Sequence, residues 1–180
     1  MKHKTALLVI DLQQLICTGK WAIADSEGTI AHVNSVADRA RAAGQPVIFI
    51  QHEEDGVMDF NSPGWQLDDR LHAKPDDIRV RKRVPDSFQN TDLQAKLQAL
   101  RVDKLVVCGA QTEYCVDSTV RGALAHGYPV VLVSDAHSTL DNGVLSADQI
   151  RAHHNQTLEH LTSYGPRVTP KAAADVHFDV

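Results

Sequence analysis

Residues Lys104–Ser134, KLVVCGAQTEYCVDSTVRGALAHGYPVVLVS, carry the clearest fold pattern in the chain. This stretch opens with the apolar run Lys104–Cys108 and closes with the run Pro129–Ser134. Both runs are nearly continuous in hydrophobic residues, as strands buried on both faces are. Between them, apolar residues three or four apart in Cys115–Ala125 predict a helix that ends before Gly127. A strand, a helix and a second strand in this order predict a βαβ unit with parallel strands.

The same alternation extends in both directions from this unit. Further apolar runs predict strands at Ala6–Ile10, Pro46–Gln51, Ile78–Arg81 and Pro166–Thr169. Helix-type spacing predicts helices at Thr29–Ala43, Thr91–Leu100 and Ser146–Leu161. Gly44 follows the first of these helices and Ser146 caps the last. We therefore predict an α/β fold, with one domain over residues 1–180 in three layers (α/β/α) and a mainly parallel, six-stranded sheet.

The irregular stretch Glu53–Lys74 interrupts this pattern. It contains Gly56, Pro63 and Gly64 and shows neither strand nor helix periodicity. A segment of this length without regular structure, inside a domain, is typical of a lid or a binding loop. We predict that it shapes a pocket, but its conformation does not follow from the pattern.

The composition narrows the kinds of partner. The formal net charge of −5 disfavours nucleic acid and membrane surfaces, and we expect a small-molecule substrate instead. Cys17, Cys108 and Cys115 form no C-x-x-C pair, so neither a disulfide framework nor a four-cysteine zinc site is expected. The apolar run Ala6–Ile10 ends at Asp11 and is short for a signal peptide, so we expect a cytoplasmic protein.

Three reactive side chains are predicted to lie at one edge of the sheet, where open parallel sheets bind ligands. Asp11 ends the first strand, Lys82 follows the third, and Cys115 starts the helix after the fourth. The positive end of that helix and the lysine ammonium favour a thiolate, so we expect the pKa of Cys115 to fall below that of a free thiol. Asp11 is then the acceptor of the thiol proton, and free N–H groups at the helix start form an oxyanion hole.

Four segments around these residues resemble those of the isochorismatase-like cysteine hydrolase family, which includes nicotinamidases and N-carbamoylsarcosine amidases. The segments are Leu8–Gln13, Lys82–Phe88, Gly109–Val116 and Val133–His137. The resemblance implies a catalytic triad of Asp11, Lys82 and Cys115, a six-stranded parallel sheet, and dimers or larger homo-oligomers. It also implies a cis peptide bond between Ala110 and Gln111. This bond would aim the N–H of Gln111, together with that of Cys115, at the substrate oxygen.

The chain departs from the zinc-binding members of that family. They carry an Asp-x-His pattern after the second strand, where this chain has Gln51-His52-Glu53-Glu54. We therefore expect no metal and no cofactor. Members that cleave vinyl ethers without a covalent step have a smaller residue in place of the nucleophile, so the presence of Cys115 favours acyl transfer.

The sequence thus predicts a hydrolase that cleaves a C–N bond of a small amide, ureide or related substrate through a thioester on Cys115. The candidate substrate contacts are Gln13, His52, Trp65 and Tyr114. The alternatives are an isochorismatase-type vinyl-ether hydrolase, a Cys–His hydrolase with His137 as the base, and a non-catalytic ligand-binding domain on the same scaffold. Whether His52, His72 or His137 contributes to the pocket stays open, as do the substrate and the oligomeric state.

Overall fold

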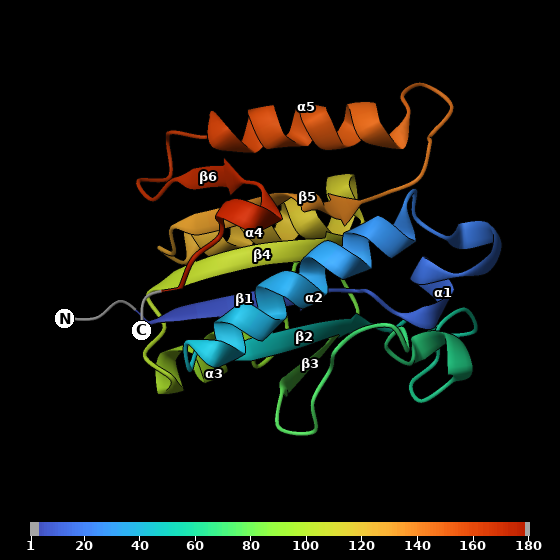
Figure 1. The fold of residues 1–180 in the computed structure, drawn as a ribbon, viewed down its shortest axis with the longest axis horizontal. Helices are drawn as coiled ribbons and strands as arrows, with labels where there is room; N and C mark the ends of the chain where they lie inside the picture. The colour runs from blue at the N-terminus through green and yellow to red at the C-terminus, as the bar shows by residue number, and fades with distance from the viewer. Residues whose placement is uncertain (1–3, 179–180) are drawn as a thin grey trace.

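Six parallel strands form one sheet through the middle of the molecule (Figure 1). The computed structural model describes residues 4–178. Its strands are β1 (Thr5–Ile10), β2 (Val47–His52), β3 (Ile78–Lys82), β4 (Lys104–Ala110), β5 (Val130–Ser138) and β6 (Val168–Lys171). Their order is β3-β2-β1-β4-β5-β6, and each neighbouring pair runs parallel. The winding direction reverses between β1 and β4, which is where open α/β sheets bind ligands.

Helices cover both faces of the sheet, because the strands present apolar side chains on both faces. Side chains that alternate along β1 enter two separate hydrophobic cores. One core packs the sheet against α3 (Leu93–Ala99), α4 (Asp117–Ala125) and α5 (Ala147–Glu159). The other core packs it against α2 (Ser26–Ala42), which crosses in front of the sheet in Figure 1. The protein is therefore built in three layers.

Short helical turns complete the regular structure. They are α1 (Gln14–Cys17), the 3-10 turns η1 (Gly19–Trp21), η2 (Pro63–Trp65) and η4 (Ala173–Asp175), and the π-type turn η3 (Thr112–Val116). Within residues 4–178, none of the helices combines the length and the apolar character needed to cross a membrane.

The structure confirms the predicted three-layer α/β fold and its six-stranded parallel sheet. The predicted N-cap is also confirmed, because Ser146 and Gln149 form a reciprocal capping box at the start of α5. The Ser146 hydroxyl accepts from the Gln149 N–H at 3.3 Å, and the Gln149 carboxamide oxygen accepts from the Ser146 N–H at 2.9 Å. Residues 1–3 and 179–180 of the predicted domain 1–180 lie outside the described residues.

One helix start was predicted wrongly. The helix expected from Cys115 begins only at Asp117, and Cys115 lies in the preceding turn η3. The Gln111 carbonyl accepts from the N–H of Val116 at 3.1 Å, a five-residue spacing that gives a wider turn than an α-helix. It also accepts from the N–H of Tyr114 at 3.2 Å. Apolar spacing does not register such a turn, because Val116 and Val120 still face the core.

A glycine allows the two central strands to approach closely near their ends. Gly109 in β4 has a φ of +121°, which L side chains rarely adopt. A Cβ atom at this position would lie 2.1 Å from the Ile10 carbonyl oxygen of β1. The chain can therefore carry the residues after β4 next to Asp11, which directly follows β1.

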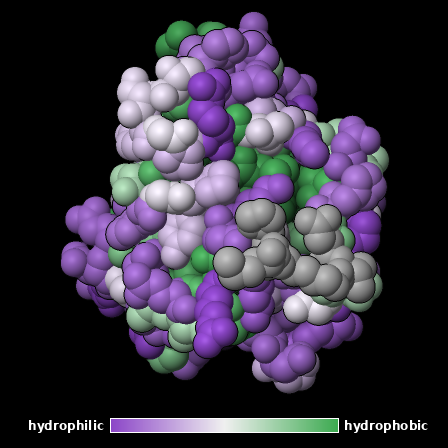
Figure 2. Space-filling view, turned by 90° about the vertical axis from the view of Figure 1, so that its left-hand side faces the viewer, coloured by the Kyte–Doolittle hydropathy of each residue, from purple (hydrophilic) through white to green (hydrophobic). Residues whose placement is uncertain are grey.

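The loop predicted over Glu53–Lys74 folds beside the end of β1. The Gln66 carbonyl accepts from the N–H of Gln14 at 2.8 Å, and the Leu12 carbonyl accepts from the N–H of Asp68 at 3.0 Å. These bonds attach the loop to the carboxyl edge of the sheet. Figure 2 shows the opposite end of the molecule, where the strands begin; hydrophilic side chains dominate it, with small hydrophobic areas between them.

Candidate active site

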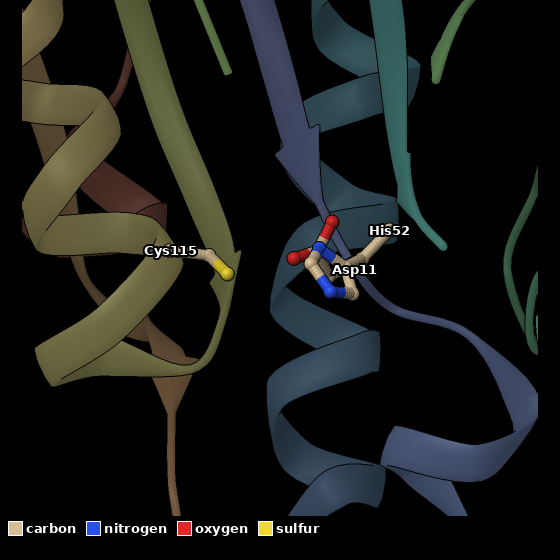
Figure 3. A group of neighbouring side chains, drawn as sticks. All are labelled: Asp11, His52 and Cys115. Carbon is tan, nitrogen blue, oxygen red and sulfur yellow. The ribbon is translucent and has the colours of Figure 1, made fainter. Parts of the chain in front are cut away.

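Four strand ends bring their side chains together at the carboxyl edge of the sheet. Asp11 follows β1, His52 ends β2, Lys82 ends β3, and Cys115 lies in the turn after β4. Because β3, β2, β1 and β4 are neighbours in this order, the four residues meet. Figure 3 shows the Cys115 thiol turned toward Asp11 and His52. The three residues predicted as a triad are therefore adjacent in space, and His52 joins them.

Lys82 connects the group. Its ammonium donates to Asp11 Oδ2 at 2.7 Å and to Cys115 Sγ at 3.1 Å, and lies 3.2 Å from His52 Nδ1. The Lys82 and Asp11 side chains are 0% and 4% exposed. Burying an ion pair is less costly when its hydrogen bonds are satisfied, and each of the three ammonium N–H groups of Lys82 has an acceptor among these neighbours. Asp11 Oδ1, in contrast, is buried and has no hydrogen-bond partner among the described residues.

The electrostatics correct one prediction about the thiol. Burial, the largest cause, and the Asp11 carboxylate raise the pKa of Cys115 to about 12, and Lys82 offsets only part of this rise. Burial also acts to lower the pKa of Lys82, but the attraction of Asp11 and Cys115 outweighs it, so this pKa is raised. The resting site therefore holds a neutral thiol between a carboxylate and an ammonium. The expected low thiol pKa is wrong, because the prediction counted the lysine but not the burial.

The turn that carries Cys115 has the backbone that the family resemblance implied. The peptide bond between Ala110 and Gln111 is cis. Gln111 and Cys115 line the same cavity.

The cavity in front of these residues has a volume of about 250 Å³. It is lined by Asp11, Leu15, Ile16, Trp21, His52, Glu54, Val57, Met58, Gln111 and Cys115. Glu54, Val57 and Met58 come from the irregular loop, as the prediction of a pocket-shaping segment implied. Leu15, Ile16 and Trp21 were missed, because their segment has no strand-end position and no motif that marks it.

Three of the candidate substrate contacts lie outside the cavity lining. Gln13 is fully buried, and its side chain holds the backbone of His52. Trp65 is buried, and its carbonyl accepts from the side chains of Gln13 and Gln51 at 2.9 and 3.1 Å. Tyr114 is 55% exposed. Gln13 and Trp65 thus support the cavity wall from behind, and His52 alone of the four candidates borders the cavity.

The other two histidines left open by the sequence have structural contacts. His137 is fully buried, with Nδ1 2.9 Å from the Thr112 hydroxyl and Nε2 3.0 Å from the Asn155 carboxamide oxygen. Burial, the largest cause, lowers the pKa of His137 to about 4. His72 is exposed and lies 2.8 Å from Asp38 on α2. Neither lines the cavity, which argues against His137 as the base of a Cys–His pair.

Asp11, His52 and Cys115 also raise the question of a metal ion. One ligand-type atom from each lies within 4.8 Å of the others, a spacing that suits a bound cation. However, the Lys82 ammonium contacts the same three side chains at 2.7 to 3.2 Å. A metal cation and this ammonium would compete for the same acceptors and repel each other, so the residues do not fit a metal here.

A doubly wound parallel sheet, with a cysteine, a carboxylate and an ammonium clustered at its topological switch point, defines a three-layer α/β protein with a nucleophile-bearing cavity. The family model described as Isochorismatase domain matches residues 5–172, and the chain belongs to the isochorismatase family of hydrolases.

Similar proteins support this membership. Streptothricin hydrolase of Streptomyces noursei is 39% identical over 138 residues, which cover 76% of this chain and 55% of that protein. Ureidoacrylate amidohydrolase RutB of Rhizobium rhizogenes is 29% identical over 171 residues, covering 74% of this chain and 70% of that protein. A crystal structure of an isochorismatase family protein has a TM-score of 0.85 and 35% identity, and the match covers 93% of this chain and 98% of that chain.

Proposed function

We propose that this protein is a cysteine-dependent amidohydrolase that cleaves the C–N bond of a small amide or ureide through a thioester on Cys115. The observation that carries the proposal is the cluster joined by Lys82, whose ammonium contacts Asp11 Oδ2 at 2.7 Å and Cys115 Sγ at 3.1 Å, so that a neutral thiol lies near a buried carboxylate. A cavity of about 250 Å³ suits a small substrate. Two similar proteins, named as a streptothricin hydrolase and a ureidoacrylate amidohydrolase, also favour amide-type bonds.

Acylation begins with proton transfer from the Cys115 thiol to Asp11. The thiolate sulfur then forms a bond to the amide carbonyl carbon, and the carbonyl electron pair moves onto its oxygen. The backbone N–H groups of Gln111 and Cys115 stabilise this oxyanion. When the carbonyl reforms, the C–N bond breaks, and the leaving nitrogen takes the proton held by Asp11. The products of this half are a thioester and an amine or ammonia.

Deacylation uses the same groups in the same order. Asp11 accepts a proton from water, and the resulting hydroxide oxygen attacks the thioester carbon. The C–S bond then breaks, the carboxylic acid leaves, and the proton returns from Asp11 to the sulfur. Each cycle therefore consumes one water and restores the thiol.

Lys82 stays an ammonium throughout this cycle. Its raised pKa keeps it charged, and its contact at 3.1 Å with Sγ stabilises the thiolate once Asp11 has taken the proton. The substrate therefore meets a neutral thiol that ionises only in the course of the reaction. A resting thiol of this kind costs less to bury than a thiolate.

The test is the paired removal of two cysteines. Cys115→Ala removes the nucleophile, whereas Cys108→Ala removes a fully buried thiol of β4 outside the cavity. Ammonia release is measured over a panel of small amides and ureides, and acid-quenched protein is examined by mass spectrometry for an acyl adduct. We expect Cys115→Ala to lose turnover and adduct while Cys108→Ala keeps both. Hydrolysis that survives Cys115→Ala would overturn the proposal.

A further inference from the structure

The buried ammonium of Lys82 has one acceptor for each of its N–H groups. An ammonium carries three donors and no lone pair. Asp11 Oδ2, Cys115 Sγ and His52 Nδ1 lie 2.7, 3.1 and 3.2 Å from Nζ. The Lys82 side chain is 0% exposed, so no solvent shares these contacts. The bond to the histidine therefore has one direction: Lys82 donates and His52 Nδ1 accepts.

This direction fixes the proton on the histidine ring. Burial, the largest cause, and the Lys82 ammonium lower the pKa of His52, so its ring is neutral near pH 7. A neutral imidazole has one N–H, and because Nδ1 accepts, that N–H is on Nε2. Figure 3 shows one ring nitrogen beside the Asp11 carboxylate and the other turned away from it.

The backbone that carries the His52 ring is held in position by the side chain of Gln13. The Gln13 carboxamide accepts from the His52 N–H at 2.8 Å and donates to the His52 carbonyl at 3.0 Å. Gln13 is fully buried, so this two-point contact is shielded from water. His52 lines the cavity, yet no hydrogen bond joins its Nε2 to another of the described residues. Of the described residues that line the cavity, Leu15, Val57 and Met58 carry no strong acceptor, and no hydrogen bond joins the Glu54 carboxylate to the His52 ring.

We propose that His52 presents a fixed Nε2–H donor to the cavity and selects substrates that carry an oxygen acceptor next to the scissile carbonyl. This inference rests on the proposed amidohydrolase function. One ring nitrogen of His52 lies within 4.8 Å of ligand-type atoms of Asp11 and Cys115, and His52 lines the cavity, so a carbonyl carbon held at the thiol places its neighbouring atoms near the His52 ring. A site built around a hydrogen-bond donor discriminates against an analogue that lacks the acceptor.

The proton position is tested directly by NMR on the wild-type protein labelled with ¹⁵N-histidine. At pH 7, we expect the His52 Nε2 signal to be that of a protonated nitrogen and the Nδ1 signal to be that of an unprotonated one. The spectrum of His52→Gln, which lacks these signals, assigns them. A proton on Nδ1, or on both nitrogens, would overturn the inference.

The selectivity is tested with an isosteric pair of amides. Methoxyacetamide has an ether oxygen where butanamide has a methylene group, so the pair differs in one acceptor. His52→Asn keeps an acceptor near the Nδ1 position but removes the donor, whereas His52→Gln keeps a donor near the Nε2 position. The quantity measured is the ratio of kcat/KM for methoxyacetamide to that for butanamide, which cancels general losses of activity.

We expect His52→Asn to lower this ratio by about threefold to tenfold, the amount expected for one neutral hydrogen bond. His52→Gln should keep the ratio nearer to that of the wild type. An unchanged ratio in His52→Asn would contradict the inference. If the wild type releases no ammonia from any amide or ureide of the panel, the proposed function fails on its own. In that case, a His52 Nε2 shift induced by methoxyacetamide but not butanamide supports the donor, and no shift with either overturns it.

Discussion

Gln13 holds the backbone of His52 with both ends of its carboxamide. Its Nε2 donates to the His52 carbonyl at 3.0 Å, and its Oε1 accepts from the His52 N–H at 2.8 Å. The same Nε2 also donates to the Trp65 carbonyl at 2.9 Å. One buried side chain therefore joins the segment after β1, the end of β2 and the irregular loop. It thereby fixes the position of the His52 backbone at the cavity.

Replacing Gln13 should loosen this junction. Gln13→Met keeps the side-chain volume but leaves the N–H and the carbonyl of His52 without their Gln13 partners, whereas the Trp65 carbonyl keeps its bond from Gln51. Unsatisfied buried groups of this kind cost about 1–3 kcal/mol each, so for the two His52 groups we expect a loss of about 2–6 kcal/mol of unfolding free energy and a lower kcat/KM. Denaturant unfolding measures the first effect and amide turnover the second. The matched control is Gln98→Met on α3, an exposed position, which should change neither quantity.

Removing the ammonium should destabilise the protein more than removing the whole ion pair. Lys82→Met leaves Asp11 charged and buried with no cation, which typically costs about 3–5 kcal/mol. The double variant Asp11→Asn/Lys82→Met removes both charges, so we expect it to recover much of the unfolding free energy while activity stays lost. Equal stability of the single and double variants in urea would show that the pair is not energetically coupled.

His137 should make the protein lose stability in mild acid. Its pKa is about 4 in the folded state, against a usual value of 6.5. Between these two values the unfolded chain binds the proton more readily, so protonation favours unfolding as the pH falls. The stabilisation is complete above pH 6.5 and is lost toward pH 4, by about 3 kcal/mol from this residue. Unfolding free energies measured across this window give the slope.

The slope in that window is assigned with two variants. His137→Gln removes the buried imidazole, so it should flatten the dependence of unfolding free energy on pH between 6.5 and 4, whatever its own stability at neutral pH. His153→Gln changes an exposed histidine on α5 and should keep the wild-type slope. A wild-type slope in His137→Gln would show that other groups cause the acid sensitivity.

The sheet and the clustering of three reactive side chains at its edge could be predicted because both follow from local patterns. Strands buried on both faces, such as β1 and β4, read as continuous apolar runs, and their order fixes which residues stand at the strand ends. Asp11, Lys82 and Cys115 were found in this way. His52 was one of several candidates, and its contact with Lys82 depends on β2 lying between β1 and β3, which the sequence does not state.

The cavity walls and the thiol pKa could not be predicted, because both depend on how distant segments pack. Trp21 reaches the cavity through a short turn whose sequence carries no periodic signal. The pKa of Cys115 is set mainly by how deeply the thiol is buried, and the local sequence does not indicate that burial. The cytoplasmic location and self-association expected from the sequence stay predictions, as do the catalytic roles of the clustered residues.

Asp11→Asn should change the reactivity of Cys115 and the turnover in opposite directions. The Asp11 carboxylate raises the pKa of the thiol, so its removal lowers that pKa and increases the thiolate fraction at a given pH. We expect iodoacetamide to alkylate Cys115 faster in the variant at pH 8, while turnover falls by about 100-fold or more because the base is lost. Peptide mapping by mass spectrometry measures alkylation at each cysteine. Asp68→Asn is the control: Asp68 raises the pKa of Cys17, so this variant should leave the Cys115 rate unchanged. Slower alkylation in Asp11→Asn would mean that Asp11 favours a resting thiolate, contrary to the mechanism.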